Sequence, residues 1–283
     1  MIKQKQKLAI RHHNLIQESI RDNFSQLDRF KHPEITNFGY EVNGKESDGH
    51  IYGMKENNET VGLKYIGNIS AKGSNQSLIV AGMHAIIKAL IDESLTSNNL
   101  ELKMNQTLKK LHLYIQSFNN SGLGCFLFLA LTNLKNGKVW YVNAGMPRPI
   151  IFKSGSQMIE TPQDFIPDVL AEVIPPLGFD YLETFKISKT ELKASECLFV
   201  YSNNLPEIKI YGNSRIGRKG IILHCLNSFM NNTDLSDDWN KMINSSKMNN
   251  HMPESVAFIF QQLESEWKAE EDLNNLEIAE AQH

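Results

Sequence analysis

One pair of adjacent segments constrains the fold of this chain more than any other feature. The apolar runs FLFLALTNL and KVWYVNAG flank the dipeptide Asn136-Gly137. Asn-Gly favours a tight turn between two such runs, because both residues tolerate the positive φ angles that a two-residue hairpin requires. The sequence therefore predicts an antiparallel β-hairpin near the middle of the chain.

The rest of the chain continues this pattern of short strands interrupted by longer helices. Strands are expected at Phe38–Val42, Ile51–Met54, Val61–Ile69, Gly124–Thr132, Lys138–Asn143, Pro149–Phe152, Leu182–Ile187, Cys197–Tyr201 and Ser255–Gln261. Helices are expected near Gln76–Ser94, Leu100–Phe118 and Gly217–Met230. Because the strands are mostly hairpin-linked and two helices follow one another, the order favours an α+β fold with antiparallel sheets covered by helices.

The two ends of the chain differ from this central region. Residues 5–31 predict one helix with a narrow apolar stripe, which ends before His32-Pro33. Two interpretations of this N-terminal segment (1–32) stay open: a helix folded back on the domain, or a dimerisation or signal-transmitting helix. Residues 262–283 form an acidic tail that is compatible with a helix, either solvated and frayed or used for interaction.

Composition excludes several classes of protein. The 283 residues carry 29 Lys+Arg against 32 Asp+Glu, a net charge of -3, which argues against a nucleic-acid or anionic-membrane surface. No apolar run is long enough for a transmembrane helix, and the N-terminus lacks the apolar region of a signal peptide. Cys125, Cys197 and Cys225 have no metal-like spacing, and the first and second lie in apolar runs. We expect reduced core thiols and a cytoplasmic protein.

Five segments, taken in order, resemble one known family. They are SDGHIYG (47–53), YIGNISAKGSNQSLIVAGM (65–83), YVNAGMPRPIIF (141–152), LFVYSNNLPE (198–207) and MPESVAFIF (252–260). Together they are similar to the metal-dependent Ser/Thr protein phosphatases of the PPM superfamily, in the bacterial SpoIIE/RsbU branch. The resemblance spans residues 36–261 and implies an α-β-β-α sandwich of two mostly antiparallel sheets. Residues 9–30 look like the helix that often precedes this domain.

The resemblance also implies a two-metal reaction that this chain is poorly equipped to perform. The family hydrolyses phosphoserine or phosphothreonine with two Mn²⁺ or Mg²⁺ ions held by Asp carboxylates. Here the positions of the metal motifs read His50, Asn68, Ala71, Asn203, Pro253 and Glu254, and the family's His in Asn-Ala-Gly-His is Met146. The other motif residues persist: Tyr52, Gly67, Gly73, Asn143, Ala144, Gly145, Pro147, Tyr201 and Glu207. With Glu254 as the sole carboxylate of the set, two-metal binding is not expected.

Alternative interpretations of individual residues would still allow this site to bind a metal or an anion. Asp48 lies two residues before His50 and could enter the site after a register shift. His50 with Glu254 could hold one metal, or His50 could fill a vacated pocket. Lys72 could contact an anion, or it could be a solvated turn lysine, and Met146 is expected to pack.

The sequence thus predicts no catalytic residue, no metal ligand and no cofactor. The leading hypothesis is a pseudophosphatase that acts as a non-catalytic regulatory protein in bacterial partner-switching signalling. By resemblance its partner would be a STAS-type anti-sigma-factor antagonist or an associated kinase. Two alternatives remain: a divergent but active metal-dependent phosphatase acting on such an antagonist, and a sensory homodimer formed through residues 5–31.

Overall fold

The computed structural model describes most of the predicted domain and little of the chain's two ends. The described residues are 31–32, 35–42, 49–57, 61–70, 75–94, 99–118, 123–134, 136–152, 168–179, 185–193, 196–209, 214–230, 238–239, 241–243 and 256–263. The predictions for residues 1–30 and 264–283 therefore lie outside the described residues.

Two antiparallel sheets form the centre of the molecule. One sheet has the order β1-β2-β11-β10-β7-β8, and the other has the order β3-β4-β5-β6-β9. The six strands of the first are β1 (Lys31–His32), β2 (Ile35–Val42), β7 (Ile150–Phe152), β8 (Asp168–Val169), β10 (Cys197–Tyr201) and β11 (Val256–Leu263). The five strands of the second are β3 (His50–Asn57), β4 (Val61–Ile69), β5 (Cys125–Asn133), β6 (Lys138–Ala144) and β9 (Ser188–Glu191).

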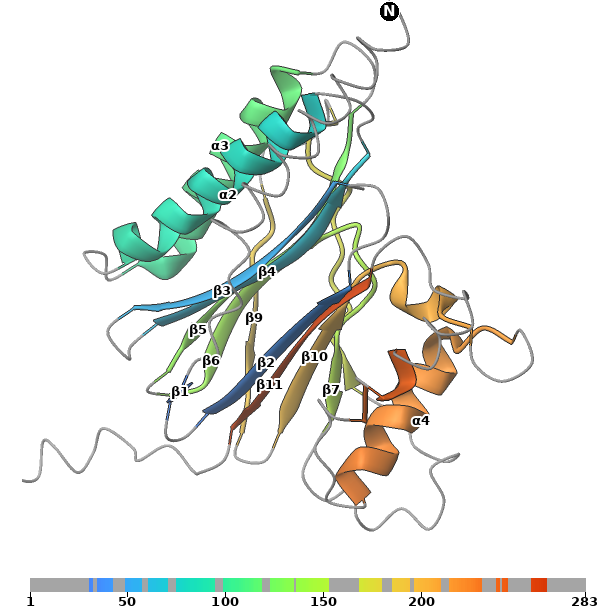
Figure 1. The fold of residues 1–283 in the computed structure, drawn as a ribbon. Helices are drawn as coiled ribbons and strands as arrows, with labels where there is room; N and C mark the ends of the chain where they lie inside the picture. The colour runs from blue at the N-terminus through green and yellow to red at the C-terminus, as the bar shows by residue number, and fades with distance from the viewer. Residues whose placement is uncertain are drawn as a thin grey trace, which may run out of the picture.

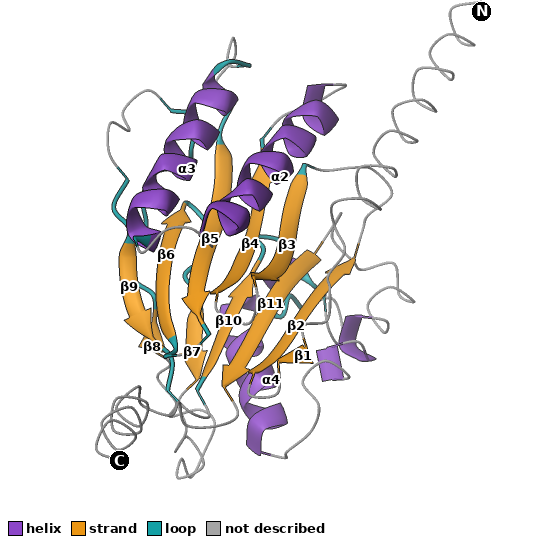
Figure 2. Cartoon of the chain, turned by 90° about the vertical axis from the view of Figure 1, so that its left-hand side faces the viewer, coloured by secondary structure: helices purple, strands orange, loops and turns teal. Residues whose placement is uncertain are grey.

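Helices cover the outer face of each sheet (Figures 1 and 2). The antiparallel pair α2 (Asn75–Ser94) and α3 (Leu100–Gln116) lies on the five-stranded sheet, and α4 (Gly217–Met230) lies on the six-stranded sheet. A short 3-10 helix, η3 (Leu205–Glu207), follows β10. The predicted α+β sandwich with the layer order α-β-β-α is confirmed.

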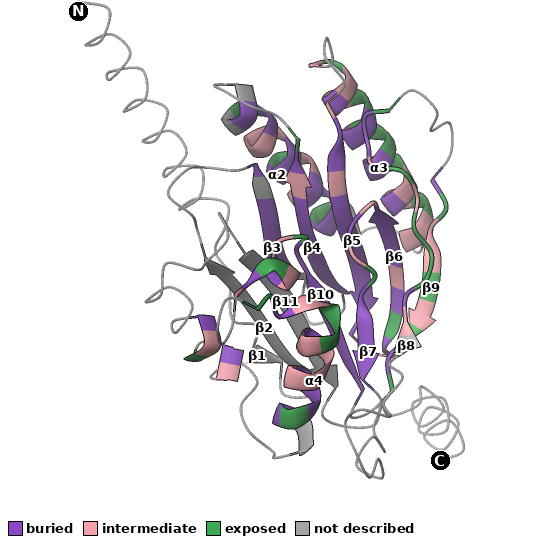
Figure 3. Cartoon of the chain, turned by 90° about the vertical axis from the view of Figure 1, so that its right-hand side faces the viewer, coloured by how far each residue is buried: buried purple, intermediate pink, exposed green. Residues whose placement is uncertain are grey.

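Three layers of buried apolar side chains lie between the helices and sheets and join them. The first, between α2/α3 and the five-stranded sheet, includes Leu63, Ile87 and Leu111. The second joins the two sheets through side chains such as Ile66, Phe128 and Val200. The third packs α4 on the six-stranded sheet through Phe199, Ile221, Cys225 and Trp239, among others. In Figure 3 the residues of β4, β5, β7 and β10 are mostly buried, whereas α2, α3 and α4 combine buried with exposed residues.

The pairing of the strands places all five family-like segments at one end of the sandwich. β4 ends and β3 and β5 begin at this end, since Ile69 pairs with Cys125 and Asn68 pairs with His50. The turn after Ala144 leads directly into β7, whose first residue, Ile150, pairs with Phe199 in the antiparallel strand β10. β10 therefore ends, and β11 begins, at the same end, which we call the motif end.

Most predicted elements are confirmed, and three details are wrong. The strand expected at Leu182–Ile187 is replaced by β9 at Ser188–Glu191; residues 185–187 are not a strand, and 182–184 lie outside the described residues. Lys31 was expected to end the N-terminal helix but pairs with Thr36 in β1. Gln262 and Leu263 were assigned to the acidic tail but extend β11, where Leu263 pairs with Ile35. In each case pairing with a neighbouring strand overrides the local pattern.

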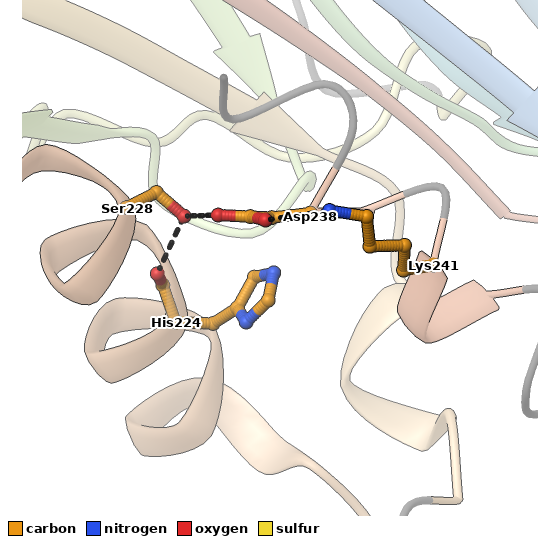
Figure 4. A network of polar contacts seen from close by, with 4 residues as sticks. All are labelled: His224, Ser228, Asp238 and Lys241. Atoms are coloured by element: carbon orange, nitrogen blue, oxygen red, sulfur yellow. Dashed lines mark hydrogen bonds and ion pairs between the residues drawn. The ribbon is translucent and has the colours of Figure 1, made fainter. Parts of the chain in front are cut away.

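A polar network holds two short helical stretches, residues 238–239 and 241–243, against α4 (Figure 4). Ser228 Oγ donates a hydrogen bond to Asp238 Oδ2 at 2.7 Å and also lies 3.2 Å from the backbone oxygen of His224. Asp238 lies 3.8 Å from Lys241 Nζ. The His224 ring meets Trp239 edge to face, and burial lowers the pKa of His224 while Asp238 opposes that shift.

Two predictions from composition can be compared with the structure. All three cysteines are free and buried, as expected of reduced core thiols. Within the part of the chain that the structure describes, no helix combines the length and apolar character needed to cross a membrane.

Candidate functional site

Two of the altered metal positions face each other across a pair of neighbouring strands. His50 begins β3 and pairs directly with Asn68 near the end of β4. Side chains alternate between the two faces of a strand, and Tyr52 and Ile66, two residues from each, pack in the layer between the sheets. Asn68 therefore lies on the face turned toward the second sheet, where it is half-buried.

The turn before His50 is fixed by the first turn of α2. Gly49 has a φ of 74°, and its carbonyl oxygen accepts a hydrogen bond from the Ile69 backbone N–H at 3.0 Å. A Cβ at this position would lie 2.6 Å from the Ile69 oxygen and overlap the side-chain amide of Gln76, which is itself buried. Glycine is required here both by the conformation and by the close approach of the helix.

The third altered position comes from the other sheet. Asn203 is exposed and lies two residues after the end of β10, in a turn in which the Leu205 N–H donates to the Ser202 oxygen at 3.1 Å. Because β4 and β10 both end at the motif end, the fold brings positions 50, 68 and 203 to one end of the sandwich.

The Asn-Ala-Gly segment between β6 and β7 has a structural role. The Asn143 side chain is buried; its Oδ1 accepts from the Met146 N–H at 2.8 Å, and its Nδ2 donates to the Pro147 oxygen at 3.3 Å. Gly145 has a φ of 74°, and a Cβ there would lie 2.8 Å from the Phe126 ring. Met146, at the family's His position, is 3% exposed and packs in the layer between the sheets, as expected.

Other retained motif residues also brace the motif end. Ser70 joins the end of β4 to the start of β5: its Oγ donates to the Gly124 oxygen at 2.9 Å and accepts from the Gly124 N–H at 3.0 Å. Tyr201 is buried in the layer under α4. Glu207 forms an ion pair of 2.5 Å with Arg215. These contacts explain why such residues can persist without a metal reaction.

The described residues of the site carry no carboxylate. The amide groups of Asn68 and Asn203 are neutral, whereas Mn²⁺ and Mg²⁺ prefer carboxylate oxygens. Among the described residues, no group of three or more His, Cys, Asp or Glu could hold a metal ion. Asp48, Ala71, Lys72, Pro253 and Glu254 lie outside the described residues, so the structure does not place them.

Two sets of residues near this end were missed by the motif comparison. Gln76 is one, and its burial against Gly49 has no signal in the sequence alone. The others are the arginines Arg148, Arg215 and Arg218, all exposed. Their signal was available, because this chain has 23 lysines but six arginines, and these three fall at or beside the family-like segments.

The comparisons with known proteins agree with the geometry. The family model for Stage II sporulation protein E (SpoIIE) matches residues 61–247. No curated protein sequence matches the chain. Among solved structures, the SiaA-PP2C domain of Pseudomonas aeruginosa is similar, with a TM-score of 0.65 and 10% identity, covering 93% of this chain and 100% of that one.

Two further solved structures share the fold. The RsbU and RsbW domains of Rv1364c from Mycobacterium tuberculosis give a TM-score of 0.59 at 11% identity, covering 82% of this chain and 61% of that one. RsbX in complex with magnesium gives a TM-score of 0.53 at 14% identity, covering 83% of this chain and 98% of that one. The chain thus spans less than two thirds of the Rv1364c fragment.

The two-sheet sandwich with its motif end therefore defines a protein of the PPM (PP2C-like) phosphatase class, in the SpoIIE/RsbU branch. Within that class, the match over residues 61–247 shows that this chain belongs to the SpoIIE family.

Proposed function

We propose that this protein is a pseudophosphatase: it keeps the phosphatase fold and binds a protein partner without hydrolysing phosphate. The observation that carries the proposal is the register of β3 and β4, which places His50 directly opposite Asn68. Where the motifs of the family have aspartates, this chain has an imidazole and a neutral amide. Such a donor set does not fit a pair of hard dications, and no hydrolytic step through metals follows from it.

The pattern of loss supports a retained binding role. Asn143, Gly145, Gly49 and Ser70 still hold the motif end in shape through buried or backbone contacts. Random decay would damage these residues as readily as the ligand positions. We infer that the shape of this end remains useful while the metal charge does not.

Family membership supports a proposal for the partner and the compartment. RsbX- and RsbU-type neighbours suggest a protein partner, and we propose a STAS-type anti-sigma-factor antagonist or an associated kinase. Sequestering such a protein, or shielding its phosphoserine, is a cytoplasmic role in partner-switching signalling.

Phosphate release tests the proposal directly. The full chain is incubated with a phosphoserine peptide and Mn²⁺, and free phosphate is measured over time. We expect no release above the rate without protein. Mn²⁺-dependent release that is lost in Asn68→Ala would overturn the proposal and support the divergent phosphatase.

Calorimetry separates the remaining one-metal alternative. Titration of the full chain with Mn²⁺, Mg²⁺ and Zn²⁺ is expected to show no saturable binding at millimolar metal. Saturable binding of one metal that is lost in His50→Ala would contradict this expectation. A matched His84→Gln variant, altered at a buried histidine between β4 and α2, controls for binding to histidines elsewhere.

A further inference from the structure

Arginine is distributed unevenly in this molecule. The chain uses 23 lysines and six arginines, and Arg148, Arg215 and Arg218 are the arginines within the described residues. All three belong to segments at the motif end, one in the turn before β7 and two beside the start of α4. The planar guanidinium group binds phosphate with two parallel hydrogen bonds, which lysine cannot do.

Strand register places the first arginine near the altered Asn203. Ile150 pairs with Phe199, and Ile150, Phe199 and Tyr201 all pack in the layer beneath α4. Arg148 is exposed and lies two residues before Ile150, and β10 runs on from Phe199 to Tyr201 toward the same end of this strand pair.

The second group of arginines reaches the same place from α4. Arg218 is in electrostatic range of Tyr201, because its charge partly offsets the rise that burial causes in the pKa of that phenol. Arg215 is held in position by its ion pair with Glu207 and by the backbone bond from the Ile216 N–H to the Ile208 oxygen, 2.8 Å long. Arg148, before β7, and Arg218, in the first turn of α4, thus both belong to the motif end, where β10 ends.

The charges at the start of α4 are the reverse of what favours a helix. The first turn has Arg218 and Lys219 and no acidic residue. Cations near a helix N-terminus oppose its dipole, so this placement lowers stability unless an anion is nearby. Glu207 is an acidic residue at this corner, and its carboxylate forms an ion pair with Arg215 rather than with Arg218 or Lys219 in the first turn of α4.

We propose that this corner, formed by Arg148, Arg215, Arg218 and Lys219 around the end of β10, binds a phosphate group without metal. The inference rests on the proposed function and deepens it: side-chain cations of the protein take over phosphate recognition on a scaffold that has lost its metal ligands. The ligand class is a phosphomonoester or phosphate dianion, either the phosphoserine of a protein partner or free phosphate. Neither bond making nor bond breaking is involved.

Binding is tested on the full chain in buffer treated with EDTA. Inorganic phosphate and a short phosphoserine peptide are titrated into ¹⁵N-labelled protein, and the arginine Nε–Hε signals are followed. We expect two or more arginine signals to shift and saturate at millimolar ligand. The double variant Arg148→Gln/Arg218→Gln should weaken binding by about tenfold or more. The double variant Arg148→Lys/Arg218→Lys keeps both positive charges but should lose part of the affinity for phosphate.

Matched controls keep the test specific. Lys109→Gln removes one exposed positive charge from α3, on the other side of the sandwich, and should leave binding unchanged. Tighter binding of the phosphopeptide than of inorganic phosphate identifies a protein phosphoserine as the ligand, and equal binding identifies free phosphate. Both support the site.

Three outcomes would overturn it: no saturable shift at tens of millimolar phosphate, equal weakening by Lys109→Gln, or binding that appears on addition of Mn²⁺ alone. Failure of the phosphate-binding proposal is distinct from failure of the proposed function, because the release of phosphate, and not its binding, decides whether the protein is a pseudophosphatase.

Discussion

At the scale of single residues, the family motifs separate into two groups with different physical roles. Asn143, Ser70 and Gly145 form turns and join strand ends, and each keeps its identity. His50, Asn68 and Asn203 stand where the family has aspartates. The first group contributes to folding in any member of the family, whereas aspartates crowded together are stable only around cations. The proposed loss of the metals would therefore remove the need for the second group alone.

The buried turn at Asn143 gives a direct test of this separation. Asn143→Ala removes the acceptor of the Met146 N–H and leaves that buried group without its bond, so we expect a loss of roughly 2 kcal/mol in the free energy of unfolding. Asn136→Ala is the matched control, because Asn136 accepts from the Lys138 N–H in an exposed turn. It should cost less than about 1 kcal/mol. Urea denaturation measures both; equal losses would show that Asn143 has no special structural role.

A buried histidine predicts a pH dependence of stability. Tyr65 Oη and His84 Nδ1 share a hydrogen bond of 2.7 Å between β4 and α2, and burial, with a smaller effect of Lys88, lowers the pKa of His84 to about 4. In the unfolded chain His84 takes up a proton near pH 6.5, so its contribution to stability is present above that pH and is lost as the pH falls toward 4. We expect a loss of roughly 2 kcal/mol between about pH 7 and pH 5 from this residue.

Comparison with His84→Gln isolates that contribution. The glutamine keeps a polar group near Tyr65 but does not titrate, so its unfolding free energy should fall less steeply with acidification than that of the unchanged chain. Parallel curves for the two proteins over this range would contradict the assignment.

At the scale of elements, most helices and strands could be predicted because their own side chains decide them. The runs of β4, β5 and β10 are apolar and buried on both faces, and α3 has buried residues spaced along one side. β9 could not be predicted in the same way. Its sequence, SKTE, carries no apolar alternation, and it is a strand because its backbone pairs with β6. Edge strands of this kind depend on the partner rather than on local propensity.

The attachment of residues 238–239 and 241–243 to α4 gives a prediction at the same scale. Ser228→Ala removes the hydroxyl that donates to Asp238 Oδ2, so we expect amide hydrogen exchange in residues 238–243 to accelerate by about tenfold or more. Lys241→Ala is the control within the network, because its contact with Asp238 is 3.8 Å long and Lys241 is largely exposed. It should change exchange little. Equal acceleration in both variants would contradict the role given to Ser228.

At the scale of the whole molecule, the two sheets bring their strand ends to one place. His50 and Asn68 come from the five-stranded sheet, and Asn203 comes from the six-stranded sheet. In a metal-dependent relative, dications would join the two sheets at this end. Here the apolar layer between the sheets, with Met146 packed inside it, joins the two sheets.

This difference predicts a fold that is stable without metal. EDTA or excess Mn²⁺ should shift the thermal midpoint of the unchanged chain by less than about 1 °C, because a ligand stabilises a protein only by binding its folded state. The variant carrying His50→Asp, Asn68→Asp, Ala71→Gly and Asn203→Asp, with Pro253→Asp added if needed, should be less stable in EDTA and recover with Mn²⁺. Differential scanning calorimetry measures both. A clear drop for the unchanged chain in EDTA would contradict a metal-free fold.

The sequence by itself determined the layer architecture, the family and the positions where acids are missing, because apolar periodicity and motif order are local properties. The small number of arginines can also be counted in the sequence, but the sequence alone does not show where in the fold they lie. Only the tertiary structure decided that His50 lies directly opposite Asn68, that Asn143 is a buried turn residue, and that Arg215 beside the start of α4 forms an ion pair with Glu207 beyond the end of β10. These facts depend on strand register and on how two sheets and a helix pack, which join residues far apart in the chain.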